Sequence, residues 1–230
     1  MLRIAALVLG ALIASSASAD VVSARYTDPT DRYDHGILGD AIEWGGLEVT
    51  TDSGQRFKLT LPETHVFEDV APRIIQTPAG RTLAMVVETE RSTGARLALY
   101  DETGLVAATP HIGRTHRWLA PIGAADLDGD GMLEIAYVDR PHLAKTILIW
   151  RLSDSGLTKV GDLPGYTNHR IGEDNIAGGI RDCGAGPQMV VADSSWRNVY
   201  AIGWDGSDFT IDSLGRHRDR TSFAAALNCR

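Results

Sequence analysis

The sequence repeats one arrangement of short apolar runs at intervals of about fifty residues. Each full copy contains four runs of about five to seven residues that are apolar throughout or alternate with polar residues, with turn-forming residues between them. β-Branched and aromatic residues are common in these runs, which predicts β-strands. The chain must therefore fold as a series of similar four-stranded units.

Repeated four-stranded units are typical of a β-propeller, in which each blade buries its faces against its neighbours. A β-sandwich uses as many short strands but does not require them to repeat. We therefore predict an all-β fold, a small β-propeller of four to five blades. The predicted repeats cover residues 35–70, 71–119, 120–176, 177–215 and, in part, 216–230.

The two ends of the predicted domain are expected to close the ring. The first copy begins with the run Ile37–Asp40, and Ser222–Asn228 is similar to the first strand of a fifth copy. The connector Asp20–Asp34 is expected to supply a strand that pairs near this tail. The sequence thus predicts closure by N- and C-terminal strands.

The stretch from Asp126 to Glu134 has the residue types and spacing of a calcium-binding loop. Carboxylates at alternate positions converge on one hard cation, a glycine at the sixth position permits the turn, a carbonyl follows, and Glu134 completes the shell. The predicted ligands are Asp126, Asp128, Asp130, the Met132 carbonyl and Glu134.

Two other interpretations of this stretch exist. An EF-hand loop needs a glutamate at position 12, where this sequence has Tyr137 inside a strand-like run. An acidic turn that binds nothing uses the same Asp and Gly residues. Calcium is the cofactor that we expect.

Residues 1–19 have the pattern of a secretory signal peptide, with Arg3, an apolar run too short to span a bilayer, and the cleavage site Ala17-Ser18-Ala19. We therefore expect one domain over residues 20–230, exported to the periplasm or the extracellular space. The formal net charge of −8 disfavours nucleic acid and anionic membranes as partners. We expect a monomer that does not insert into a membrane.

The chain has two cysteines, Cys183 and Cys229. In an oxidising compartment a disulfide is expected rather than a metal or redox pair, because no CxxC spacing is present. Aligning the copies places both at the same position of consecutive inner strands, so a disulfide would join the tail to the preceding unit.

The segment Ile122–Ala136, IGAADLDGDGMLEIA, resembles the FG-GAP or VCBS-type repeat of integrin-α-like β-propellers. In that family a DxDGDGxxD/E calcium loop joins the inner strand of a blade to its second strand. As a pattern, the resemblance extends roughly over residues 37–228. It implies a calcium-binding propeller, with one calcium site here because the other copies lack the middle carboxylates.

Histidines recur in the segments that lead into the predicted inner strands, often beside arginine. In a propeller these segments surround one mouth of the central channel, a common place for ligands. The candidate ligand-binding residues are His65, His116, Arg117, Trp118, His169, Arg170, His217 and Arg218.

Three interpretations of these residues remain open. Each histidine could hydrogen-bond an adjacent blade and serve the fold alone. The histidines and arginines could bind an anion, or the imidazoles could converge on a transition metal. We expect a binding or scaffold module for a protein or a small anionic ligand. The alternative is a hydrolase or lyase with a His/Arg/Asp site at the channel mouth, although no known catalytic motif is present.

Overall fold

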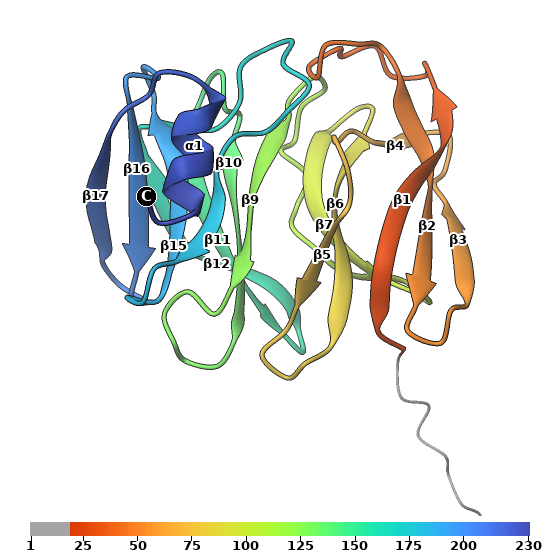
Figure 1. The fold of residues 1–230 in the computed structure, drawn as a ribbon. Coiled ribbons are helices and arrows are strands. Elements are labelled where there is room, and N and C mark those ends of the chain that lie inside the picture. Colours follow the sequence, from red (N-terminus) through yellow and green to blue (C-terminus); the bar gives the residue numbers. More distant parts are fainter. Residues whose placement is uncertain (1–18) are drawn as a thin grey trace, which may run out of the picture.

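The computed structural model describes residues 19–230, which form seventeen β-strands and one short helix (Figure 1). The all-β prediction is confirmed for this part of the chain. The predicted signal peptide lies outside the described residues except for Ala19. Among the described residues, no helix has the length and apolar character needed to cross a membrane.

All strand pairs are antiparallel, and they form three sheets. The first sheet contains β1 (Val21–Thr30), β2 (Glu43–Thr51), β3 (Arg56–Thr60), β4 (His65–Phe67), β5 (Arg73–Gln76), β6 (Thr82–Glu90), β7 (Gly94–Asp101) and β8 (Gly104–Ala108). The second contains β9 (Leu119–Ala125), β10 (Leu133–Asp139), β11 (Thr146–Ser153) and β12 (Gly156–Pro164). The third contains β13 (Tyr166–Thr167), β14 (Gly179–Asp182), β15 (Pro187–Asp193), β16 (Asn198–Trp204) and β17 (Phe209–Arg216).

The predicted strands of the second, third and fourth copies coincide with β5–β8, β9–β12 and β14–β17. The second strands carry much of the core: β10 is buried at every residue and β6 at all but its two ends. Such strands are apolar on both faces, so both faces of the sheet must be covered. The repeat in the sequence therefore correctly predicted the strands of these three units.

The main core clusters lie between successive layers. Met85 and Leu97 of the first sheet pack with Ile135 of β10, and Ile149 of the second sheet packs with Val191 and Ile202 of the third. Figure 1 shows these layers side by side. The helix α1 (Arg220–Leu227) covers β15 and β16 through Phe223.

The first copy differs from the prediction. Ile37–Asp40 forms a turn, in which Gly36 and Gly39 have φ values of 58° and 100° and the amide of Gly39 donates to the Gly36 carbonyl. One edge of β2 pairs with β1 instead. Because β1 occupies this edge of β2 from Glu43 to Thr51, the segment 37–40 cannot pair there and is left as a connection.

The predicted closure by N- and C-terminal strands is wrong. β1 pairs with β2, and the tail is the helix α1 rather than a strand; the two lie at opposite sides of the molecule in Figure 1. The physical reason is local: Asp219 caps the helix by accepting from the Thr221 amide, and the run of alanines favours helix.

The predicted disulfide between Cys183 and Cys229 is present, with Cα atoms 5.7 Å apart. It joins the residue after β14 to the residue just beyond α1. Arg181 strengthens the same contact by donating to the Ala226 carbonyl. The disulfide therefore fixes a helix, not a strand, against the third sheet.

We expect replacement of both cysteines by serine to lower the free energy of unfolding by about 2–4 kcal/mol, because the cross-link restricts the unfolded chain. Amide hydrogen exchange should increase first in α1. The measurement is thermal and urea unfolding with exchange mass spectrometry. The reduced wild-type protein is the matched control and should behave like the variant; equal stability of the oxidised protein and the variant would contradict this role.

Candidate functional site

The predicted calcium loop lies between β9 and β10 and folds around its own carboxylates. Oxygen atoms of Asp126, Asp128 and Asp130 lie within 4.8 Å of one another. The Gly131 amide donates to Asp126 Oδ2 at 2.9 Å, and Gly129 and Gly131 have φ values of 76° and 87°, which glycine adopts without strain. The loop thus gathers negative charge in a small volume.

A single cation from the protein, Arg151 of β11, lies against this loop. Its guanidinium contacts Asp128, Asp130 at 3.0 Å and Glu134 at 2.6 Å. Arg151 is directly opposite Glu134 in the strand register, so the sheet itself places the two charges together. Arg151 therefore offsets part of the charge that a metal ion would neutralise.

One oxygen of the loop remains without a partner among residues 19–230. Asp126 Oδ1 is buried and accepts no hydrogen bond. A buried carboxylate oxygen is costly to leave unpaired, and oxygen ligands are what calcium prefers. The residues present therefore fit a calcium ion, which Asp126 would bind through this oxygen.

The loop also contacts the third sheet. A Cβ atom at Gly206 would lie 2.9 Å from Asp128 Oδ2, so the β16–β17 turn approaches the loop closely. The Arg151 guanidinium lies 5.6 Å from the Trp204 ring centroid, a cation–π distance. The loop is therefore part of the junction between the second and third sheets.

The four recurring histidines lie in four separate environments. His65 is near Glu88 and His111, and His116 stacks on His35 with ring centroids 5.1 Å apart. His169 is buried between Trp118 and His142, and His217 contacts Trp196 and Phe223. The four imidazoles therefore do not converge on one axial metal.

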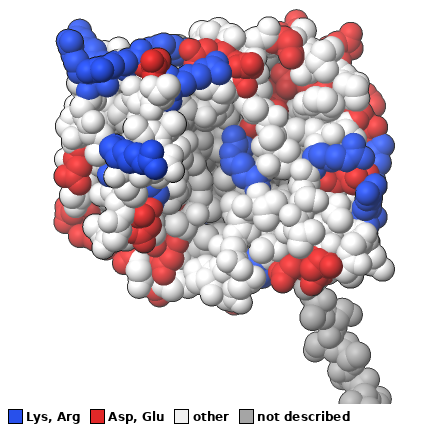
Figure 2. Space-filling view, viewed as in Figure 1, with Lys and Arg blue, Asp and Glu red and all other residues white. Residues whose placement is uncertain are grey.

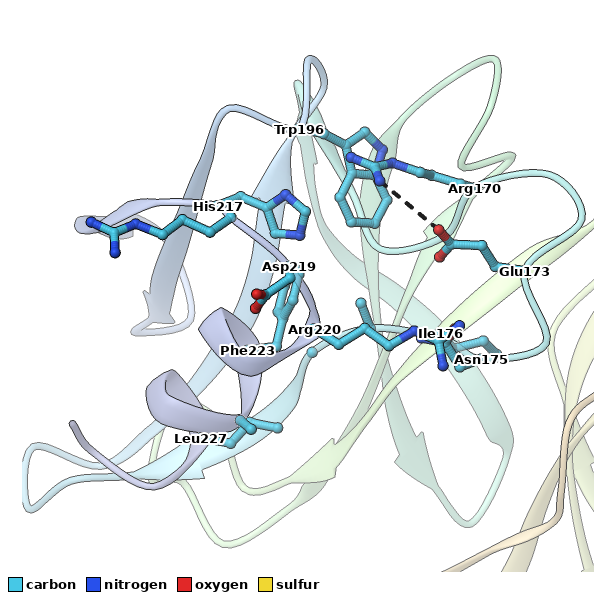
Figure 3. Close-up of a pocket in the computed structure, with 14 residues that line it drawn as sticks. Arg170, Glu173, Asn175, Ile176, Trp196, His217, Asp219, Arg220, Phe223 and Leu227 are labelled. Carbon is cyan, nitrogen blue, oxygen red and sulfur yellow. Dashed lines mark ion pairs between the residues drawn. The ribbon is translucent and has the colours of Figure 1, made fainter.

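Arg170, His217 and Arg218 line one cavity of about 450 Å³, together with Arg220 (Figure 3). Its apolar wall includes Trp196 and Phe223. The Arg170 guanidinium lies 4.3 Å from the Trp196 ring centroid and only 3.9 Å from a Glu173 oxygen. Figure 2 shows basic side chains gathered over this corner of the molecule, near the end of β17 and the start of α1.

A tight turn between β15 and β16 presents Trp196 to this cavity. Trp196 has a φ of 59°, a left-handed conformation that is unusual for a bulky residue. Burial acts to raise the pKa of Asp193, but hydrogen bonds from the Ser195 hydroxyl and from the amides of Arg197, Asn198 and Ser195 hold the turn and lower this pKa to about 2. The Trp196 ring is thus held in place by the backbone.

A second cavity, of about 230 Å³, lies beside the connection between β1 and β2. The residues that line it include His35, His116, Arg117, Trp118, Arg140 and His142. His35 Nδ1 lies 2.5 Å from the fully buried Glu68, whose pKa is raised by burial. Trp118 is buried and donates to the Glu68 carbonyl at 2.8 Å. The His116 side chain is more exposed than that of His35.

The half-buried His142 and the buried His169 form a neutral pair. His169 donates from Nε2 to the Glu173 carbonyl, so its Nδ1 accepts from His142 Nε2 at 3.1 Å. Burial, and then the proximity of His169, lowers the pKa of His142 to about 4. For His169 this geometry supports a structural role.

Sequence reasoning did not single out several residues of these sites: His35, Glu68, His111, His142 and Trp196. None of them occupies the recurring position, so the period of the repeat gives no signal for them. Only the tertiary contacts bring these residues together.

Comparisons with known proteins give no family. No protein-family model and no curated protein matches the chain. Among solved structures, the chain is similar to one from the complex of the fission yeast SREBP-SCAP binding domains, with 9% sequence identity, a TM-score of 0.39, and coverage of 94% of this chain and 53% of that one. The chain spans about half the length of that neighbour. A likeness at this level carries no argument about function.

Glu43, at the start of β2, is a buried carboxyl, with an exposed fraction of 3%. Burial, followed by the charges of Glu68, Asp40 and Asp69, raises the pKa of Glu43 to about 9. The folded protein therefore keeps this proton at neutral pH. The unfolded chain loses it above pH 4.5.

We expect Glu43→Gln to stabilise the protein at pH 8 and to have little effect near pH 4. A raised folded-state pKa costs stability as the pH rises from the unfolded value of 4.5 to about 9. At about 1.4 kcal/mol per pH unit above the unfolded pKa, the expected gain at pH 8 is roughly 5 kcal/mol. Thermal unfolding between pH 4 and 9 measures it, with Glu63→Gln, at a side chain 91% exposed, as the matched control. Parallel pH curves for wild type and Glu43→Gln would contradict the assignment.

Proposed function

We propose that the chain is an exported, calcium-stabilised β-propeller of the FG-GAP or VCBS type that binds a small anionic ligand or an acidic segment of a partner protein. The observation that carries the binding role is the cavity where Arg170, Arg218 and Arg220 gather beside Trp196 and Phe223. Its volume of about 450 Å³ suits a small organic ligand.

The propeller assignment rests on the repeated units. Three successive units, β5–β8, β9–β12 and β14–β17, share one strand order, and each packs against the next. The disulfide supports export, because disulfides persist in oxidising compartments.

Calcium has a structural role in this proposal. The loop carries four carboxylates, one oxygen of Asp126 is unpaired, and the loop contacts the neighbouring sheet at Gly206. An ion bound only by the folded state adds its binding free energy to stability. Calcium would therefore hold the second sheet against the third.

We expect calcium to raise the melting temperature of the wild-type protein and to have no such effect on Asp128→Asn. At a calcium concentration 100 times the dissociation constant, the stabilisation is about 2.7 kcal/mol. Without calcium the variant should lose little, because Arg151 keeps its contacts with Asp130 and Glu134. The measurement is thermal unfolding with calcium or with chelator.

Asp154→Asn, at an exposed turn residue, is the control and should respond to calcium as the wild type does. If Asp128→Asn shifts the melting temperature equally with calcium and with chelator, the loop is an acidic turn held by Arg151 alone.

The ligand in the arginine-lined cavity should combine negative charge with an apolar part. Three arginines supply donors for a carboxylate or phosphate, whereas Trp196, Phe223 and Leu227 supply apolar surface. Glu173 lies at a weak ion-pair distance of 3.9 Å from Arg170, so the guanidinium remains available to a better acceptor.

We expect Arg170→Gln to weaken the binding of citrate and inorganic phosphate about 10-fold, because one charge-assisted contact is worth roughly 1.5 kcal/mol. Isothermal titration calorimetry measures the affinities. The matched control is Arg25→Gln, which removes an exposed arginine of β1 paired with Glu48. Equal affinities of wild type and Arg170→Gln for both anions would remove this cavity as the binding site.

A second candidate function is an enzyme, and one observation favours it. His35 is held by the buried Glu68 and stacks on His116 beside the second cavity, as a general base held by a carboxylate would be. A hydrolase or lyase would convert its ligand, whereas a binding module returns it unchanged. Product analysis after the anion titrations therefore separates the two functions.

A further inference from the structure

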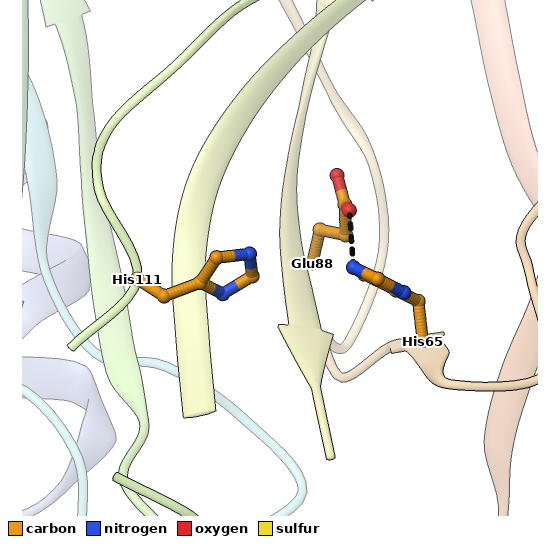
Figure 4. A group of neighbouring side chains, drawn as sticks. All are labelled: His65, Glu88 and His111. Carbon is orange, nitrogen blue, oxygen red and sulfur yellow. Dashed lines mark ion pairs between the residues drawn. The ribbon is translucent and has the colours of Figure 1, made fainter. Parts of the chain in front are cut away.

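A group of two histidines and one glutamate lies away from both cavities and from the calcium loop. His65 begins β4, Glu88 is near the end of β6, and His111 follows β8 in the segment that runs beside β7. One ligand atom from each lies within 4.8 Å of the other two. Figure 4 shows the three side chains turned toward a common space.

Hydrogen bonds fix how each imidazole faces this space. His111 Nδ1 lies 2.7 Å from the Gly94 carbonyl, which only accepts, so Nδ1 carries the proton and Nε2 keeps its lone pair. His65 Nδ1 lies 2.8 Å from the Thr64 hydroxyl. Such outer contacts are typical of metal-binding histidines, because they orient the ring and set its tautomer.

The Nε2 atoms of His65 and His111 have no hydrogen-bond partner within residues 19–230. No hydrogen bond reaches either of them, and His65 Nε2 lies 3.7 Å from Glu88 Oε1, which is too far for a hydrogen bond. Burial lowers the pKa of His111, which keeps this ring neutral at physiological pH. The His111 lone pair, His65 Nε2 and a Glu88 oxygen therefore face one another without a hydrogen bond; His65 Nε2 has a lone pair in the tautomer whose Nδ1 donates to the Thr64 hydroxyl.

Glu88 is held rigidly from the opposite side. Arg96, directly across the strand pair, donates to Oε1 and Oε2 at 2.8 and 2.9 Å, and the Tyr100 hydroxyl donates to Oε2 at 2.8 Å. Each carboxylate oxygen has two acceptor sites, so Oε1 retains one for a metal. Arg96 and Tyr100 would then be the outer contacts of a carboxylate ligand.

We propose that His65, Glu88 and His111 form a zinc site with an open position toward solvent. Two imidazoles and one carboxylate are a ligand set that zinc takes with a fourth position left for water. In a tetrahedral site, ligand atoms about 2.0–2.1 Å from one ion lie roughly 3.4 Å apart, so from the present spacing of up to 4.8 Å the side chains must move inward on binding. Both histidines are half-buried, which leaves access for the ion.

The site differs from the calcium loop in chemistry and in place. The calcium loop offers only oxygen ligands at the β9–β10 end of the second sheet, whereas the zinc site offers nitrogen ligands where β4 meets the end of β6. Nitrogen ligands select zinc over calcium. The two ions can therefore be tested separately in one protein.

The test uses the full chain without a polyhistidine tag, with zinc chloride titrated against a chromophoric chelator in the presence of calcium. We expect one zinc equivalent to bind, and His65→Gln or His111→Gln to weaken binding by at least about 10-fold. Cobalt(II) bound to the wild type should show the intense visible absorption of a four-coordinate site. Zinc should also raise the melting temperature of the wild type but not of these variants.

Glu88 is left unchanged because its buried bonds to Arg96 and Tyr100 also support the fold. Circular dichroism verifies that both histidine variants fold. His116→Gln removes an imidazole whose side chain is 44% exposed and lies outside the group, so it controls for zinc capture by surface histidines. The proposal is overturned if the wild type binds no stoichiometric zinc, or if His65→Gln and His111→Gln bind zinc as tightly as His116→Gln.

Discussion

The structure depends on second strands that are apolar on both faces. β10 is buried along its whole length and β6 along nearly all of it, so neither sheet is stable with an uncovered face. Each sheet therefore requires a neighbour: two core clusters lie between neighbouring sheets, and a third packs β1 and β2 against β6 and β7 within the first sheet. The helix α1 meets the same requirement for the third sheet, where Phe223 and Ala226 cover Val190 and Ala192.

Packing the sheets side by side leaves their ends free to carry polar groups. The β9 arrow in Figure 1 leads to the acidic loop at one end, whereas the connections that enter the sheets at the other end hold the histidines and both cavities. A rigid packed scaffold with variable connections is a common arrangement for binding proteins. In the proposed function, calcium would stabilise the fold at one end of the sheets, and the ligand would bind at the other end.

Pairs of opposite charge across adjacent strands recur at the polar ends. Glu134 faces Arg151, and Glu88 faces Arg96, each directly across an antiparallel pair. A buried carboxylate is stable only when it is paired or hydrogen-bonded. In both places an arginine from the next strand stabilises the acid while leaving oxygen atoms that a metal ion can share.

The sequence by itself determined the all-β class, the strands of β5–β8, β9–β12 and β14–β17, and the disulfide, because hydrophobic period and cysteine count are local signals. It also located the acidic loop, since its ligands are close together in the chain. Tertiary structure decided where the tail packs and which residues form the two cavities and the His65–Glu88–His111 group. The tail could pair as a strand only if an edge faced it, and β2 had already paired with β1. His111 joins His65 and Glu88 only because three strands separated in sequence meet there, a contact that no spacing along the chain encodes.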